Sequence, residues 1–263
     1  MSFIRHISLA ALVLGGFLAA APAQAAAGQD LEAQVLSIIK AHPEVVLDII
    51  KSNPVEVLGA LQQGTDTHRR STLHKQWDED RKIPKKVALE GRPVGGPSNA
   101  PVTIIAFSDF VCQYCHSGAY TIGNLMKKYP GKIRLIFKQV PKTEAGRVAG
   151  YWFLAAYRLD KAKAWKMYAL AFDRQDNVEA DATGTMRAIA KECGFNVDVL
   201  EGEVNMNSKA FSVMMDQDAA DAKALGLVGT PYYLVNDIIV RGAIPFENFS
   251  EAIDLALQYA PAK

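Results

Sequence analysis

The chain has 263 residues, among them 29 Lys and Arg, 28 Asp and Glu, and 3 Cys, and its formal net charge is +1. Its 49% apolar and 22% charged residues are typical of a folded globular protein, and they exclude a disordered chain, a collagen and a disulfide-packed mini-protein. The single long uncharged apolar stretch excludes a polytopic membrane protein, and the balanced charge gives no indication that the protein binds nucleic acid.

Residues 1–25 have the pattern of a secretory signal peptide. Arg5 supplies the positive start, residues 7–20 form the apolar core, and Ala23-Gln24-Ala25 gives a small-x-small cleavage site. The apolar core is too short for a membrane anchor, which needs about 20 residues. We therefore predict cleavage near Ala25 and export to the periplasm, an oxidising compartment in which paired thiols have redox or structural roles.

Residues 26–64 are predicted to form two or three short helices. Residues 38–48 and 49–59 form a repeat in which six of eleven positions are identical. Each repeat contains a Pro that suits the first helical position, and Asn53 is a suitable N-cap for the second helix. So apolar a segment must pack on the main domain or on copies of itself, and we expect a homo-oligomer formed through residues 30–63.

Residues 65–86 contain a run of mixed charges and are predicted to be a solvated helix or linker. The remainder, residues 87–263, has the pattern of an α/β domain. Its first part predicts a short edge strand at residues 86–90 and a buried central strand at residues 102–107. A helix at residues 112–129 follows.

The second part of this domain is expected to contain a strand, a helical insertion, a hairpin and a last helix. The strand at residues 132–139 has alternating apolar residues, and the Ala-rich insertion covers about residues 143–220. Asn236-Asp237 predicts a two-residue hairpin turn, and residues 246–259 predict the last helix. Breaks in the insertion are expected near residues 160, 173–178, 194–196 and 205–207.

Cys112 and Cys115 are the most informative residues. They follow the buried strand and open the predicted helix, where unpaired N–H groups and the helix dipole favour an anion. A thiolate is the attacking species in disulfide exchange, so this position would make Cys112 reactive. The spacing lets Cys115 form a disulfide with Cys112, and Cys115 would be the more buried, resolving thiol.

Three kinds of site fit this Cys-x-x-Cys pair. A structural disulfide or zinc half-site is the simplest, but zinc needs about four ligands and the remaining Cys and His are scattered. With His116 the motif also matches haem c attachment, although a haem c domain is usually helical throughout. We favour a thiol–disulfide active site that needs no metal and no cofactor.

Thr230 and Pro231 form a second element, between the end of a helix and the start of a strand. A Pro in this position is compatible with a cis peptide bond. If this loop lay beside the cysteines, the backbone of Thr230 could pair with a substrate strand. The alternative is an ordinary Pro at a strand end, but the two elements together favour the redox site.

The segments 107–115, 229–231 and 241–243 together resemble the DsbA-like family of exported oxidoreductases over residues 87–263. This resemblance implies a thioredoxin fold with an inserted helical domain, with Cys112 as nucleophile, Cys115 as resolving thiol and Thr230-Pro231 as the cis-proline loop. The N-terminal segment is similar to the oligomerising extensions of the suppressor-of-copper-sensitivity and Com1-like branches.

The sequence departs from the oxidases of this family, which typically have Pro-His between the cysteines. Gln113 and Tyr114 occupy these positions, and Tyr114 and Thr230 are similar to the isomerases DsbC and DsbG. No His lies between the cysteines to hold the thiolate, although His116 could partly substitute. We therefore favour an isomerase or reductase over a dithiol oxidase, and a copper-binding or chaperone module is a third hypothesis. The expected partners are unfolded or misoxidised exported proteins and a membrane redox partner.

Other residues are interpreted more simply. Asp109 is either a surface cap or a proton-transfer carboxylate for Cys115. Cys193 is expected to be a small buried apolar group, with a regulatory or intermolecular thiol as the alternative. The three Trp residues are expected to be packing residues.

Overall fold

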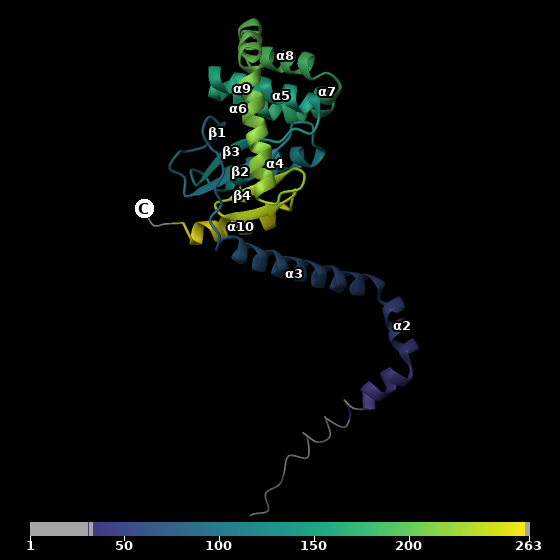
Figure 1. Cartoon of the computed structure of the whole chain (residues 1–263). Coiled ribbons are helices and arrows are strands. Elements are labelled where there is room, and N and C mark those ends of the chain that lie inside the picture. Colours follow the sequence, from purple (N-terminus) through teal and green to yellow (C-terminus); the bar gives the residue numbers. More distant parts are fainter. Residues whose placement is uncertain (1–30, 32–33, 261–263) are drawn as a thin grey trace, which may run out of the picture. The chain divides into compact units, whose positions relative to one another are not determined.

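The computed structural model describes residue 31 and residues 34–260 of the chain (Figure 1). The predicted signal peptide lies outside these residues. Contacts divide the chain into two compact units, and the division falls after Thr67, within a long helix. Among the described residues, no helix combines the length and the apolar character needed to cross a bilayer.

The N-terminal unit is helical, but the prediction of short helices is wrong for the last one, which has 27 residues and continues into the predicted charged linker. Residues 34–41 are helical, α2 comprises Pro43–Ser52, and α3 begins at Pro54 and continues to Asp80. Asn53 was predicted to cap the start of the second helix, but its side-chain amide donates to the carbonyl oxygen of Ile49, 2.8 Å away at the end of α2. This amide satisfies one of the carbonyl groups that every helix end leaves unpaired.

The C-terminal unit contains a five-stranded sheet with the strand order β1-β3-β2-β4-β5. β2 and β3 are parallel, and α4 (Gln113–Lys128) connects them; all other neighbouring strands are antiparallel. The strands are β1 (Val94–Gly95), β2 (Val102–Ser108), β3 (Ile133–Gln139), β4 (Tyr232–Val235) and β5 (Ile238–Arg241).

The predicted central strand is confirmed as β2, which is almost entirely buried because both faces of the sheet are covered. The alternation predicted for β3 placed apolar residues on one face only, but both faces of this strand are buried. Ile133 and Leu135 belong to one buried cluster, while Ile136 belongs to the cluster on the other face. Lys138 is also fully buried.

The helical insertion lies between β3 and β4, and Figure 1 shows its helices gathered beside the sheet. The expected breaks near residues 160, 173–178 and 194–196 are confirmed. The expected break at 205–207 is wrong, because α9 continues through these residues, where buried Val204 and Phe211 pack the helix against the core. The helices are α5 (Glu144–Leu159), α6 (Lys161–Asp173), α7 (Gln175–Ala180), α8 (Ala182–Glu192) and α9 (Val197–Ala224).

The predicted hairpin and last helix are present, the latter as α10 (Phe246–Gln258). Asn236 has φ of 50°, the left-handed conformation that a two-residue hairpin turn requires. Its side chain accepts from the N–H of Thr103 at 2.9 Å, which attaches the turn to β2.

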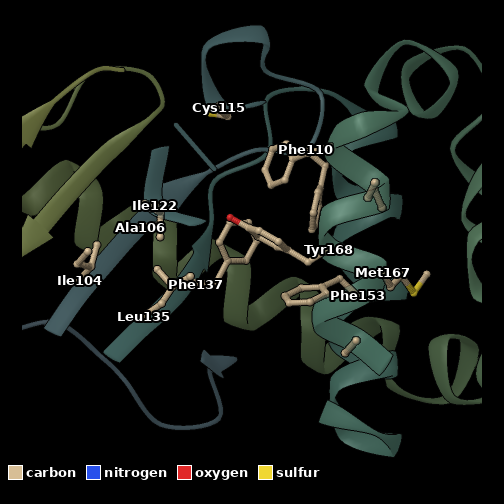
Figure 2. Close-up of a cluster of buried hydrophobic side chains, with 14 of the residues drawn as sticks. Ile104, Ala106, Phe110, Cys115, Ile122, Leu135, Phe137, Phe153, Met167 and Tyr168 are labelled. Atoms are coloured by element: carbon tan, nitrogen blue, oxygen red, sulfur yellow. The ribbon is translucent and has the colours of Figure 1, made fainter. Parts of the chain in front are cut away.

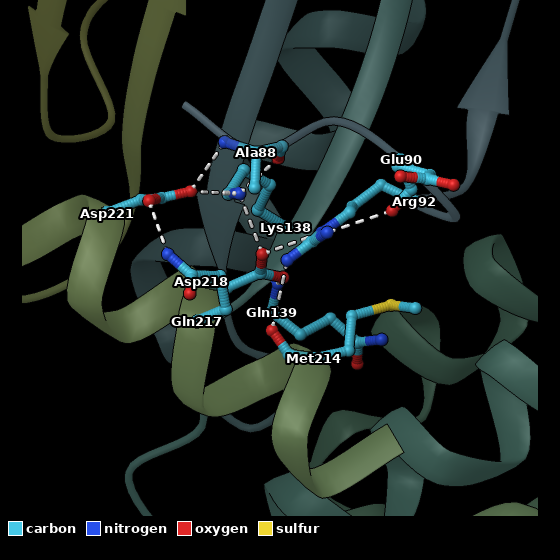
Figure 3. Close-up of polar contacts among 9 residues, drawn as sticks. All are labelled: Ala88, Glu90, Arg92, Lys138, Gln139, Met214, Gln217, Asp218 and Asp221. Carbon is cyan, nitrogen blue, oxygen red and sulfur yellow. Dashed lines mark hydrogen bonds and ion pairs between the residues drawn. The ribbon is translucent and has the colours of Figure 1, made fainter. Parts of the chain in front are cut away.

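The predicted edge strand at residues 86–90 is not formed. The backbone of Ala88 is instead satisfied by side chains: its N–H donates to Asp221 (2.9 Å) and its carbonyl accepts from Lys138 (2.6 Å). Figure 3 shows these contacts together with the ion pairs from Lys138 to Asp218 and from Arg92 to Asp218. A buried ion-pair cluster therefore holds this segment against β3 and α9.

Part of the predicted charged linker also packs into the C-terminal unit. Trp77 of α3 is fully buried. Asp80 accepts from the N–H of Ile239 (3.2 Å) and pairs with Arg241 (3.2 Å). The helix end is therefore attached to β5 rather than solvated on all sides.

Candidate active site

The two cysteines lie at the start of α4, as predicted. Cys112 is the N-cap residue in an extended conformation, and its carbonyl accepts from the N–H of Cys115 at 2.8 Å. Cys112 is partly exposed, whereas Cys115 is fully buried, and neither forms a disulfide in this structure. This arrangement gives one thiol that a substrate can reach and one that it cannot.

Cys112 is set up to ionise near neutral pH. The hydrogen bond from the Cys115 thiol is the largest cause, and it lowers the pKa of Cys112 from 9.0 to about 6 against the effect of burial. The Thr230 side chain and the N–H groups of Cys115 and Tyr114 also favour the thiolate. Both N–H groups belong to the first helical turn, where the helix dipole favours an anion, which is the effect expected from the sequence.

Cys115 has the opposite character. Its hydrogen bond to the Cys112 sulfur and its burial raise the pKa of the Cys115 thiol. The side chains of Ser108 and Thr230 and the N–H of Asp109 oppose this rise by hydrogen bonding to the same sulfur. Ser108 was not identified from the sequence, although a polar residue at the end of an otherwise apolar strand could have indicated it.

The cis-proline loop lies beside Cys112, although 118 residues separate them. The Cys112 thiol donates to the carbonyl oxygen of Thr230 at 3.4 Å, and the Thr230–Pro231 peptide bond is cis. The Pro231 carbonyl accepts from the N–H of Gly242 (3.0 Å), which attaches the loop to the end of β5. The structure therefore brings together the two elements that the sequence singled out.

Asp109 is buried, so the predicted surface cap is wrong. Its carboxylate accepts from the N–H groups of Val111 (3.2 Å) and Lys142 (2.9 Å), and burial raises its pKa. The carboxylate lies so close to Gly146 in α5 that a methyl group at Gly146 would overlap it. Asp109 thus joins the active-site loop to the insertion, and Gly146 provides the space.

The same loop is attached to the insertion at Phe110. The Gln175 amide of α7 donates to the Phe110 carbonyl at 2.8 Å. The Phe110 ring packs on Phe137 and Phe172, with ring centroids 5.4 and 4.9 Å away. Figure 2 shows Phe110 and Cys115 at the same end of this buried aromatic cluster. The position of the cysteines therefore depends on the insertion as well as on the sheet.

The remaining predicted residues are on the surface. Gln113 and Tyr114 are exposed between the cysteines. The His116 ring is oriented toward α6, with Nε2 3.9 Å from Asp173 Oδ1, which gives no support to its predicted role beside the thiolate. His116 is one of the residues that line an apolar cavity of about 300 Å³ between α4 and α6.

Cys193 is buried at the end of α8, and burial raises the pKa of its thiol. This position agrees with its expected packing role. Within residue 31 and residues 34–260, no group of three or more His, Cys, Asp or Glu side chains is placed to hold a metal ion.

Comparisons with known proteins bear on both the fold and the site. Residues 88–255 match the protein family described as Thioredoxin, and this match covers more than half of the chain. A probable disulfide bond formation protein D of Bacillus cereus is 28% identical over 172 residues, which cover 62% of this chain and 77% of that protein. The Na(+)/H(+) antiporter NhaA 3 of Salinispora tropica is 27% identical over 164 residues, but the chain spans only 24% of that protein.

Two solved structures share the fold. BdbD from Bacillus subtilis, in its oxidised form, has a TM-score of 0.59 and 21% identity, and the match covers 67% of this chain and 98% of BdbD. ScsC of Proteus mirabilis has a TM-score of 0.55 and 18% identity, and the match covers 89% of this chain and 99% of ScsC. The thioredoxin fold with a helical insertion is confirmed. The chain therefore belongs to the thioredoxin family, as a thiol–disulfide oxidoreductase.

Proposed function

We propose that this protein is an exported protein disulfide isomerase. In its reduced form, the Cys112 thiolate attacks a wrong disulfide of a client protein. A bond forms between Cys112 and one client sulfur, the client disulfide breaks, and its electron pair goes to the other client sulfur. A client thiolate then attacks the mixed disulfide and releases Cys112 as a thiolate, so the reaction consumes no oxidant. Cys115 can resolve the same intermediate, and this releases a reduced client.

The surroundings of Cys112 carry the proposal: its sulfur lies beside the Thr230 carbonyl, and neither residue between the cysteines is a cation. A strongly oxidising enzyme stabilises its thiolate so much that the pKa falls to about 3.5, whereas a reducing thioredoxin has a pKa of about 7. The pKa of Cys112 is lowered to about 6, nearer to the second value. Gln113 and Tyr114, the residues between the cysteines, are exposed and contribute no cation that would lower it further. A less stabilised thiolate makes the Cys112–Cys115 disulfide a weaker oxidant, so the membrane redox partner would have to supply the electrons that keep the protein in the dithiol form that isomerisation requires.

The surface around Cys112 is suited to an unfolded client. Tyr114 lies between the two cysteines, and Val228 lies two residues before Thr230 and is 85% exposed. Both present large apolar side chains to the solvent. The Thr230 carbonyl accepts from the Cys112 thiol only while that sulfur is protonated. In the thiolate form this carbonyl is free to accept from the N–H of an extended client strand.

Self-association through residues 30–63 is a second part of the proposal. Most large aliphatic side chains in this segment are exposed within the described chain, among them Leu36, Ile38, Leu47, Ile49, Ile50, Leu58 and Leu61. An exposed apolar surface of this extent is typical of an interface. Several active sites in one oligomer could hold one client, which would assist repeated exchange.

The oligomer can be tested with one charge change in α2. Ile49→Glu alters a side chain that is 57% exposed, so the helix itself should tolerate it. Ser52→Glu is the matched control, because it adds the same single negative charge at an exposed polar residue of the same helix. Light scattering on the mature chain should give a smaller mass for Ile49→Glu than for the wild type and the control. A monomeric wild type would remove this part of the proposal.

The isomerase can be tested with a protein that has scrambled disulfides, such as scrambled ribonuclease A. The reduced protein should restore the activity of the scrambled ribonuclease without added oxidant. Cys112→Ser should abolish this activity, and Cys115→Ala should retain part of it because client thiols can resolve the intermediate. Cys193→Ala is the control and should be unchanged.

A dithiol oxidase is the second candidate, and the name of the Bacillus cereus relative, disulfide bond formation protein D, favours it. An oxidase would transfer its Cys112–Cys115 disulfide rapidly to a reduced client. Fast oxidation of reduced ribonuclease, with no recovery of the scrambled form, would replace the isomerase by the oxidase.

A further inference from the structure

Tyr233 carries a buried hydroxyl that the mechanism described so far does not use. This residue lies in β4, two residues after Pro231, and is 2% exposed. Its ring packs on Phe249, with ring centroids 5.0 Å apart. Its hydroxyl has no hydrogen-bond partner among the described residues. Buried polar groups are nearly always hydrogen-bonded, so an unpartnered one requires an explanation.

The hydroxyl lies against α4 at Gly118. A methyl group at Gly118 would overlap the Tyr233 oxygen and would lie 3.1 Å from Tyr233 Cζ. Gly118 is therefore the residue that admits this hydroxyl to the helix surface.

Cys115 is a reactive residue on the same buried face of this helix. Cys115 and Gly118 are both buried and lie three residues apart, so their Cβ positions are about 5–6 Å from each other. Helical Cα–Cβ bonds tilt toward the N-terminus. The space that Gly118 leaves open, which Tyr233 fills, therefore lies on the side of Cys115.

We infer that the Tyr233 hydroxyl donates a hydrogen bond to the Cys115 sulfur when this sulfur leaves as a thiolate. The inference rests on the proposed function, because it concerns the exchange step at the same site. A thiolate attacks Cys112 Sγ and forms a new disulfide with it. The Cys112–Cys115 bond breaks, its electron pair goes to Cys115 Sγ, and the Tyr233 O–H donates to this sulfur without losing its proton.

The burial of Cys115 explains the need for such a donor. A buried thiolate has lost the hydration of a free one, so each donor from the protein lowers the barrier to its formation. Burial and the charges of Tyr168, Cys115 and Cys112 raise the pKa of Tyr233 well above 10.0. Tyr233 therefore remains protonated and keeps its donor throughout the physiological pH range.

Tyr233→Phe in the full mature chain tests the inference, and Tyr232→Phe is the matched control. Tyr232 is the preceding residue in β4 and is partly buried against the core cluster on the other face of the sheet. Phe keeps the ring of Tyr233 and removes an unpartnered hydroxyl, so the variant should fold at least as well as the wild type.

Two rates should be measured, each from the mass that an alkylating agent adds to the protein. The first is reduction of the Cys112–Cys115 disulfide by dithiothreitol, in which Cys115 leaves. The second is alkylation of reduced Cys112 by iodoacetamide, in which Cys115 does not leave. For Tyr233→Phe we expect the first rate to fall about ten-fold, which corresponds to one charge-assisted hydrogen bond, and the second to stay within about two-fold. Tyr232→Phe should change neither.

Other outcomes would overturn the inference. Reduction of Tyr233→Phe at the wild-type rate would show that the hydroxyl does not act on Cys115. Equal slowing of both reactions would indicate a general distortion of the site. Gly118→Ala, which displaces the hydroxyl, should reproduce the selective slowing. A wild type that exchanges no disulfides would remove the proposed function itself, whereas normal exchange with an unchanged Tyr233→Phe would remove only this inference.

Discussion

The Cys115 thiol is the largest cause of the acidity of Cys112, so Cys115→Ala should raise the pKa of Cys112. A hydrogen bond to a charged group contributes about 1.5–3 kcal/mol, and the lower limit applies because Cys112 is partly exposed. A loss of about 1.4 kcal/mol corresponds to about one pKa unit. The midpoint of ionisation should move from about 6 to about 7.

The rate of alkylation of Cys112 as a function of pH measures this midpoint. At pH 6 the thiolate fraction should fall from about one half to about one tenth, so iodoacetamide should react about five-fold more slowly with Cys115→Ala. Above pH 9 the two proteins should react at the same rate. Cys115→Ser keeps a hydroxyl donor and should be intermediate, and Cys193→Ala should match the wild type because Cys193 is buried.

An unchanged midpoint in Cys115→Ala would refute this reasoning. In that case the N–H group of Tyr114 and the Thr230 side chain would be sufficient to hold the Cys112 thiolate. A midpoint that returned fully to about 9 would also be inconsistent with this assignment, because it would mean that the N–H groups at the start of α4 do not stabilise the Cys112 thiolate.

Three further predictions concern stability, and urea denaturation of the reduced protein measures each. Gly146→Ala should cost about 1–3 kcal/mol, because its methyl group would overlap the Asp109 carboxylate; full stability would show that the loop can move away. Lys138→Met should cost about 3 kcal/mol, because it leaves buried Asp218 with one cation fewer; a neutral result would mean that Arg92 compensates alone. The free energy of unfolding of the wild type should exceed that of Cys112→Ala by an amount that grows as pH rises from about 6 to 9.0 and disappears below about 6, because folding lowers the pKa of Cys112. A difference in unfolding free energy that does not depend on pH would contradict this assignment.

The local signals in the sequence predicted the elements that carry the site. The apolar strand followed by Cys112 predicted a helix start, and Asn236-Asp237 predicted a hairpin turn with the required backbone conformation. Both are short-range effects that depend on neighbouring residues. The break expected at residues 205–207 does not occur, because the packing of buried Val204 and Phe211 outweighs the low helix propensity of the Asn residues between them.

Pairings over long distances could not be predicted from the sequence. Lys138 in a strand would normally be solvated, and its burial depends on Asp218 and Asp221, about 80 residues later. The same cluster took the backbone bonds of Ala88 that a strand at residues 86–90 would have used. Ser108 and Tyr233 were missed for the same reason, because their roles follow from which groups surround Cys115.

The register of two strands explains why the site forms at all. Phe107 of β2 pairs with Tyr232 of β4, and the two strands are antiparallel. The chain that leaves β2 after Ser108 therefore reaches Cys112 at the same end of these two strands where Pro231 leads into β4. The insertion between them adds many residues, but it begins and ends at this sheet and need not alter the pairing. A shift of β4 by one residue would turn Tyr233 away from α4 and would change the position of Thr230 relative to Cys112. The contact between the Cys112 thiol and the Thr230 carbonyl is thus a consequence of sheet register, and substitutions in β4 should affect thiol chemistry more than substitutions at similar depth in the insertion.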